Sequence, residues 1–192
     1  VAEGDPFNPR EIRNAAERIR ALNYFEDVQV ETREGTSAEQ VIVEVDVVER
    51  PTGSFGFGGS YSISSGLGLL INFEEANFLG RGQRLAFDFD TTADTRSANL
   101  SFTEPFFLGR DLAFGLDLFY NTTDNDNSDF STQVVGFRPS FSFALGEASS
   151  LQLRYALSSD EIFDVATGSS PILQAEEGTK ITSALGYTYT FD

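Results

Sequence analysis

The chain has 192 residues, of which 13 are basic and 30 acidic, and its formal net charge at pH 7 is -17. This acidity argues against binding to nucleic acid, whose phosphates are contacted by Lys and Arg, and against binding to anionic lipid through a basic patch. Because the chain contains neither Cys nor His, it excludes disulfides, thiolate and imidazole metal ligands, and a Ser-His-Asp triad.

Residues 8–23 are predicted to form a helix. Asn8 has a side chain suited to cap it, Pro9 suits the first helical position, and Glu11 follows the cap by three residues. Asn23 suits the left-handed residue that often ends a helix. Between these ends, apolar residues recur with helical spacing and make one apolar face: Ile12, Ala15, Ala16, Ile19 and Leu22.

Two strands are predicted to follow this helix, with a turn that begins at Glu34-Gly35. A helix and a hairpin in about 50 residues bury little surface and are marginal alone. We therefore expect a preceding strand and helix to be missing and the chain to be truncated at both ends, the alternative being a small α+β cap for the next domain. The alternating valines of the two strands are Val28 and Val30, then Val41, Val43, Val45 and Val47.

Residues 54–192 are predicted to form a mainly β structure, an antiparallel transmembrane β-barrel. In residues 112–120, LAFGLDLFY, every second side chain is apolar, while Gly115 and Asp117 lie on the other face. This alternation is typical of a barrel wall, whose strands cross a bilayer in roughly 9–11 residues without a long apolar run. A soluble β-sandwich or a lipocalin-like barrel is the alternative. The eight predicted strands lie near residues 54–63, 67–76, 83–92, 95–104, 112–121, 130–143, 149–158 and 179–191.

Charged residues of these strands segregate to one face, as a barrel wall requires. A charge at mid-membrane on the lipid face costs roughly 2–4 kcal/mol for Arg or Lys. Arg96 and Glu75 depart from the pattern, but both lie near predicted strand ends, where this cost falls. The lipid-facing candidates are Leu67, Leu69, Ile71, Phe73, Leu85, Phe87, Phe89, Leu151, Leu153, Tyr155 and Leu157. The candidates for the opposite face are Glu74, Arg84, Asp88, Asp90, Arg138 and Arg154.

Two strands carry residues that disfavour regular pairing. Pro139 lies inside the sixth predicted strand, where we expect a bulge or a locally open edge. Gly56, Gly58 and Gly59 are expected to remove side chains from the inner face of the first strand and to weaken it. The missing side chains would either leave room for a plug or allow a tight bend of the barrel, or they would belong to a strand that must open. Connections 77–82, 105–111 and 144–148 are expected in the periplasm, and 64–66, 93–94, 121–129 and 159–178 outside the cell.

Four stretches, in this order and spacing, carry a resemblance to a known family. Residues 20–28, RALNYFEDV, look like the end of a POTRA helix and its next strand, and residues 48–55, VERPTGSF, like the junction into a barrel. Residues 77–82, NFLGRG, and 103–107, TEPFF, look like the first two periplasmic turns. The chain thus resembles the BamA family of outer-membrane assembly factors, which combines POTRA domains with a β-barrel.

The resemblance implies a domain organisation and a mechanism. Residues 1–50 would be the C-terminal part of a periplasmic POTRA domain, and residues 51–192 the N-terminal half of a sixteen-stranded outer-membrane barrel. Incoming barrel strands would pair at the seam that the first strand makes with the last one. The seam residues would be Ser54, Phe55, Gly56, Phe57, Gly58, Gly59, Ser60 and Tyr61, and a second client-binding edge, in the POTRA sheet, would contain Phe25, Asp27, Val28 and Val30.

The implied partners are unfolded outer-membrane proteins, the lipoproteins of an assembly complex, and outer-membrane lipid and lipopolysaccharide. No cofactor, metal or nucleic acid is implied. A two-partner-type secretion pore for one dedicated substrate and a passive channel are the alternative functions, although a porin needs no domain like residues 1–50.

Two groups of carboxylates are candidates for reactive or metal-binding sites. Asp88 and Asp90 form a carboxylate pair, but without a nucleophile or base they suit a lumen lining better than an enzyme. The segment with Asp124, Asn125, Asp126 and Asp129 offers oxygen ligands for Ca²⁺. It lacks the central Gly and late Glu of a calcium loop, so a solvated loop is expected, with neither an enzyme nor a metal site.

Overall fold

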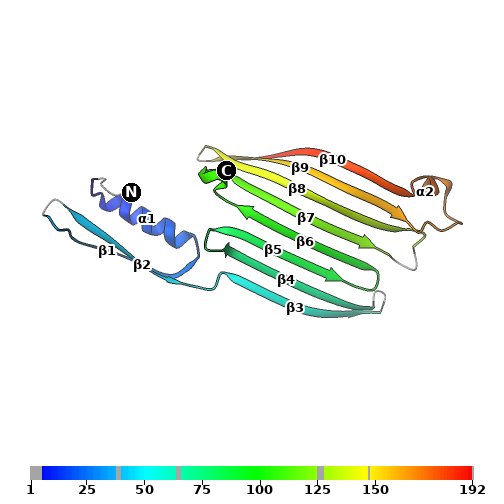
Figure 1. Ribbon diagram of the computed structural model, residues 1–192, viewed down its shortest axis with the longest axis horizontal. Helices are drawn as coiled ribbons and strands as arrows, with labels where there is room; N and C mark the ends of the chain where they lie inside the picture. The colour runs from blue at the N-terminus through cyan, green and yellow to red at the C-terminus, as the bar shows by residue number, and fades with distance from the viewer. Residues whose placement is uncertain (1–5, 38–39, 64–65, 125–127, 147, 192) are drawn as a thin grey trace. The chain divides into compact units, whose positions relative to one another are not determined.

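The computed structural model describes residues 6–37, 40–63, 66–124, 128–146 and 148–191. The chain divides into two units, Val1–Thr52 and Gly53–Asp192. The first contains a helix and a hairpin, and the second a single large sheet (Figure 1). Among the described residues, no helix has both the length and the apolar character needed to cross a membrane.

The helix α1 (Pro9–Ala21) begins where the sequence predicts. Asn8 Oδ1 accepts a hydrogen bond from the Arg10 backbone N at 3.1 Å, and Asn8 Nδ2 donates to Glu11 Oε1 at 3.0 Å. Asn23 has a φ of 60°, which confirms its left-handed conformation one residue after Leu22, the C-cap. The local capping residues therefore define both ends of this helix.

The hairpin of the first unit consists of β1 (Phe25–Glu34) and β2 (Val41–Glu49), which pair antiparallel. The helix lies against β1: Arg20 Nη2 donates to the Val28 carbonyl oxygen at 2.6 Å, and Ala16 and Val28 are buried. The valines of β2 are exposed. The core of the described part of this unit is therefore small, as expected for so short a segment.

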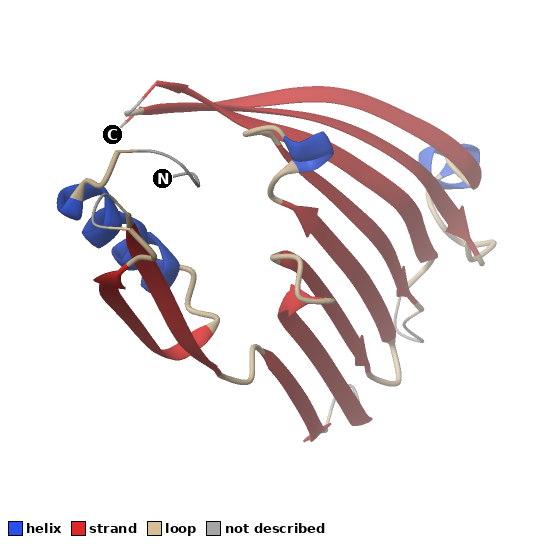
Figure 2. Ribbon diagram, turned by 60° about the vertical axis from the view of Figure 1, so that its left-hand side comes forward, coloured by secondary structure: helices blue, strands red, loops and turns tan. Residues whose placement is uncertain are grey.

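The second unit is an antiparallel meander in which every strand pairs with the next, and Figure 2 shows that the sheet is curved and open. The eight predicted strands are confirmed in number and order, and β3 and β10 form the two edges. The strands are β3 (Gly53–Ser62), β4 (Gly66–Phe78), β5 (Gln83–Thr91), β6 (Thr95–Glu104), β7 (Ala113–Thr123), β8 (Ser131–Gly146), β9 (Ser149–Phe163) and β10 (Gly178–Phe191).

The register confirms the predicted division into two faces. Side chains directly opposite one another form continuous rows, because residues of one face pair only with residues of the same face. One apolar row runs through Phe73, Phe87, Leu100, Leu118, Phe137 and Leu157. The next row on the other face runs through Asp88, Asn99, Phe119, Gly136, Ser158 and Thr182.

Three details differ from the sequence prediction. The β8–β9 register keeps step from Phe137↔Leu157 to Ser140↔Arg154, so there is no bulge at Pro139. Arg138 and Pro139 have no paired residue in β9, which fits the expected alternative of a locally open pairing. β9 continues to Phe163 rather than ending near residue 158, because its polar end still pairs with β8 and β10. The connection that follows contains a short helix, α2 (Pro171–Ala175), and the one before β7 contains a 3-10 turn, η1 (Phe107–Gly109).

Candidate functional site

The predicted seam residues all lie in β3, at one edge of the eight-stranded sheet (Figure 1). β3 pairs with β4 from Gly53↔Glu75 to Ser62↔Gly66, and no strand of the described part of the chain pairs with its other side. An edge strand presents a row of backbone N–H and C=O groups with which an added strand pairs readily. The position of β3 therefore suits pairing with another strand.

The side chains of β3 alternate between the faces in a way that the Gly-Gly pair obscures in the sequence. Gly58 lies on the polar face, but Gly59 pairs with Leu69 and lies on the apolar face, between Phe57 and Tyr61. The expectation that Gly59 belongs to the inner face is wrong, because consecutive residues of a strand point to opposite sides. The exposed apolar side chains of the strand are Phe55, Phe57 and Tyr61, and its polar-face residues include Ser54, Gly56, Gly58 and Ser60.

The two polar-face glycines of β3 have different surroundings. A Cβ atom added at Gly56 would overlap Oδ1 of Asn72, the residue directly opposite in β4. A Cβ atom at Gly58 would have no heavy atom of the described residues within 4 Å. A side chain at position 56 therefore needs Asn72 to move, whereas a side chain at position 58 would meet open space. The sequence analysis missed Asn72, because its position over Gly56 depends on the β3–β4 register.

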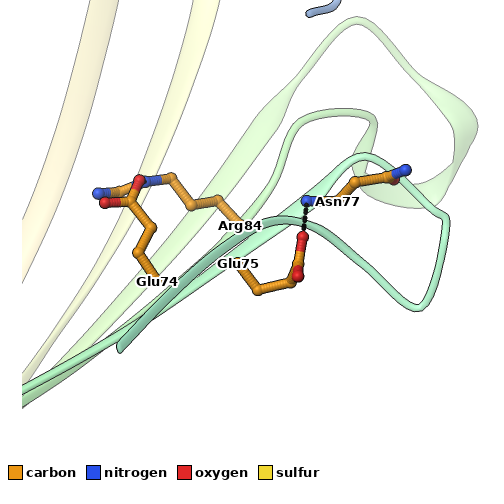
Figure 3. A network of polar contacts seen from close by, with 4 residues as sticks. All are labelled: Glu74, Glu75, Asn77 and Arg84. Carbon is orange, nitrogen blue, oxygen red and sulfur yellow. Dashed lines mark hydrogen bonds and ion pairs between the residues drawn. The ribbon is translucent and has the colours of Figure 1, made fainter. Parts of the chain in front are cut away.

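Two polar contacts lie at the Glu75 end of this pairing, one between β4 and β5 and one within β4 (Figure 3). Arg84 Nε lies 2.8 Å from Glu74 Oε1 in an ion pair, which confirms that these two predicted polar-face residues face the same side. Glu75 Oε1 accepts a hydrogen bond from the Asn77 backbone N at 2.9 Å. Both partners lie outside β3, so neither of these contacts fixes the edge strand.

The second predicted client-binding edge, Phe25 to Val30, lies in β1. The side chain of Val28 is 3% exposed, and Asp27 accepts hydrogen bonds from the Val28 backbone N at 2.9 Å and from Gln29 Nε2 at 2.8 Å. The β1–β2 register shifts between Phe25 and Asp27. Both backbone groups of Val28 are thus already hydrogen-bonded, the N–H to Asp27 and the carbonyl oxygen to Arg20. The role of this strand as a client-binding edge stays a prediction.

The remaining polar candidates form no recognisable reactive centre in the described residues. Asp88 and Asp90 lie on the same face of β5, opposite Asn99 and Ser97 of β6. Asp124 Oδ1 accepts a hydrogen bond from Ser131 Oγ at 2.9 Å, while residues 125–127 of the candidate calcium loop lie outside the described residues. No group of three or more His, Cys, Asp and Glu side chains suited to a metal ion occurs within the described ranges.

A shallow hollow of about 560 Å³ lies over the central strands of the sheet. Much of its lining belongs to the apolar face, including Phe87, Leu100, Leu118, Phe137 and Leu157. Because these side chains offer few hydrogen-bonding groups, the hollow suits hydrocarbon chains better than a polar substrate.

Comparisons with known proteins relate both units to described families. A model of the Omp85 superfamily domain matches residues 77–192, and a POTRA model, described as a surface antigen variable number repeat, matches residues 1–50. The chain is 29% identical over 189 residues to the outer membrane protein assembly factor BamA of Neorickettsia risticii, covering 98% of this chain and 26% of that protein.

Two further similarities extend this result. The BamA of Nitratidesulfovibrio vulgaris is 29% identical over 192 residues, covering 100% of this chain and 24% of that protein. The crystal structure of Haemophilus ducreyi BamA lacking POTRA domains 1–3 superposes with a TM-score of 0.73 at 21% identity, over 100% of this chain and 40% of that one. The chain thus spans about a quarter of the length of these curated relatives and shares the fold of the solved structure.

Proposed function

The chain belongs to the Omp85 superfamily, and we propose that it is part of a bacterial outer-membrane protein that assembles and inserts other β-barrel proteins. Two relatives that match nearly the whole chain are named outer membrane protein assembly factor. Residues 1–50 would lie in the periplasm, and the partners would be unfolded outer-membrane proteins, assembly lipoproteins, and outer-membrane lipid and lipopolysaccharide. The protein would act without covalent catalysis.

The proposed mechanism uses the free edge of β3. An incoming strand must pair its backbone N–H and C=O groups before it reaches hydrocarbon, because each unpaired group there costs several kcal/mol. The edge of β3 supplies those partners by β-augmentation. The single observation that carries the proposal is the position of this Gly-rich strand at the end of the sheet order. Gly56, Gly58 and Gly59 would keep the seam weak enough to open.

The test is the Gly58→Val variant of the full-length protein. Open space surrounds this position, so Val raises strand propensity by up to about 1 kcal/mol without a clash. If the seam must open, client insertion into vesicles should slow about fivefold, measured with several unrelated barrel proteins.

The matched control is Ala184→Val, which makes the same kind of change at an exposed residue of β10, a strand outside the proposed seam. It should leave the insertion rate unchanged. An unaltered rate in Gly58→Val, or equal slowing in both variants, would contradict templating at β3. A defect confined to one secreted substrate would instead favour a dedicated secretion pore.

A further inference from the structure

Two connections at the same end of the sheet repeat one sequence pattern. Residues 75–81 read EANFLGR and residues 104–110 read EPFFLGR, so both follow the pattern Glu-X-X-Phe-Leu-Gly-Arg. The first joins β4 to β5, and the second joins β6 to β7. In a meander these two connections lie on the same side, separated by a pair of strands, or roughly 10 Å.

The backbones of the two turns match as closely as their sequences. The Gly80 backbone N donates to the Asn77 carbonyl oxygen at 2.9 Å, and in the second turn Gly109 N donates to Phe106 O at the same distance. The carboxylate that begins each pattern also has one role: Glu75 and Glu104 each accept a hydrogen bond from the backbone N two residues later, at 2.9 and 3.2 Å.

The leucine of each turn has an unfavourable backbone and an exposed side chain. Leu79 and Leu108 have φ angles of 57° and 56°, a left-handed conformation that Gly or Asn adopts at lower cost. Their relative exposures are 72% and 78%, so burial inside the described structure does not repay the strain. A large apolar residue at both strained positions points to a contact outside the chain.

The arginine of each turn also has a side chain that is available for contact with a ligand. Arg81 and Arg110 are exposed, and neither side chain has a hydrogen bond or ion pair with another described residue. Gln83 Nε2 donates to Glu104 Oε2, which joins the end of the first turn to the start of the second. The two turns therefore present two leucines and two arginines as one connected surface.

An aromatic cluster shows what this surface adjoins. Phe107 of the second turn packs against Phe114 and Phe141, with ring centroids 5.1 and 5.9 Å apart. Phe114 and Phe141 pair with each other across β7 and β8 and continue the apolar face. Aromatic side chains at the end of a barrel's apolar band mark the level of the lipid headgroups. The leucines and arginines of the turns lie next to this level.

We propose that residues 75–82 and 104–111 form a paired-turn anchor that binds phospholipid at this membrane surface. Leu79 and Leu108 enter the headgroup region, and Arg81 and Arg110 bind lipid phosphates. The overall acidic charge argues against a broad basic patch, but single arginines at equivalent positions suffice to contact individual phosphates. This proposal rests on the membrane location of the sheet, and not on client insertion.

The first test replaces both leucines by asparagine, as Leu79→Asn with Leu108→Asn, in the full-length protein folded into vesicles of phosphatidylcholine and phosphatidylglycerol. Asn accepts the left-handed backbone but loses the apolar contact. The paired-turn anchor predicts that the folding equilibrium constant falls about tenfold or more, measured by urea unfolding. The control Ile172→Asn, at an equally exposed residue of α2 with 78% exposure, should change it much less.

The second test removes the two charges, as Arg81→Gln with Arg110→Gln. The folding equilibrium constant should fall severalfold in vesicles containing phosphatidylglycerol, and added salt should reduce this difference. A gain in stability from the two Asn substitutions would overturn the paired-turn anchor, because relief of backbone strain alone has that sign. Client insertion per folded molecule should stay unchanged, which keeps this test separate from that of the β3 seam.

Discussion

At both edges of the eight-stranded sheet, a glycine lies directly opposite a longer polar-face side chain that covers it. At the β3 edge, Asn72 covers Gly56, and at the β10 edge, Arg154 covers Gly186. The covering residues differ in how they are held. Arg154 Nη1 donates to Thr188 Oγ1 at 2.6 Å, whereas the Asn72 side chain has no hydrogen bond with another described residue.

The strand pairing also favours β10 over β3. β10 has 14 residues and pairs with β9 from Gly178↔Ile162 to Phe191↔Ser149, while β3 has 10 residues and three glycines within its interior. Each glycine lowers strand stability because it loses more backbone entropy on ordering and offers no side chain for packing. Within this sheet, β10 is therefore paired more firmly with β9 than β3 is with β4, and β3 is the strand of the proposed seam.

The largest loss of stability is expected at the centre of the sheet, where a glycine that is paired on both sides is also covered by neighbouring atoms. A Cβ atom at Gly136 would lie 2.6 Å from the Leu157 carbonyl oxygen and 2.6 Å from Phe119 Cζ. Arg138 in turn lies over the Phe119 ring, 5.4 Å from its centroid. Gly136→Ala should lower the free energy of unfolding by about 3 kcal/mol, because a backbone oxygen cannot move without loss of pairing.

Urea unfolding of the full-length protein in vesicles measures this change, with the folded fraction read from heat-modifiable gel mobility. Gly58→Ala is the matched control, since its added Cβ meets open space. Equal stability of the two variants would show that position 136 tolerates a side chain. The backbone of β9 and the ring of Phe119 would then move aside without loss of strand pairing.

A smaller loss of stability is expected in β10. A Cβ atom at Gly186 would lie 3.0 Å from Arg154 Nε, so we expect Gly186→Ala to push the guanidinium outward and weaken its hydrogen bond with Thr188. The lost hydrogen bond should cost about 1 kcal/mol, partly offset by the lower entropy of the unfolded chain. A double-mutant cycle with Thr188→Val measures the coupling, and additive effects would contradict the proposed role of Arg154.

Much of this arrangement follows from local sequence patterns, and the rest depends on register. Two-residue alternation predicts the eight strands and their faces because it depends only on neighbouring residues, and Asn8 with Glu11 predicts the start of α1 for the same reason. The covering of Gly56 by Asn72 was not predictable, because it needs the alignment of β3 with β4. The left-handed conformation of Leu79 was also missed, since Leu has no local preference for it.

The smallest effect, and the one that most directly tests the weak edge, is expected for Gly56→Ala. The added Cβ displaces Asn72 Oδ1, but Asn72 has no hydrogen-bond partner among the described residues, so it rotates away at little cost. The free energy of unfolding should fall by less than about 0.5 kcal/mol. In an Asn72→Ala background the same substitution should instead stabilise the protein by about 0.4–1 kcal/mol, because only the entropy term of the unfolded chain remains.

This reversal of sign separates a loosely covered glycine from a rigidly packed one. Urea unfolding of the four variants of the cycle, in the same vesicles, gives the coupling between Gly56 and Asn72 directly. If Gly56→Ala costs as much as Gly186→Ala, then Asn72 is held as firmly as Arg154. The pairing of β3 with β4 would then be as secure as the pairing of β10 with β9, and glycine content alone would not explain a weak β3.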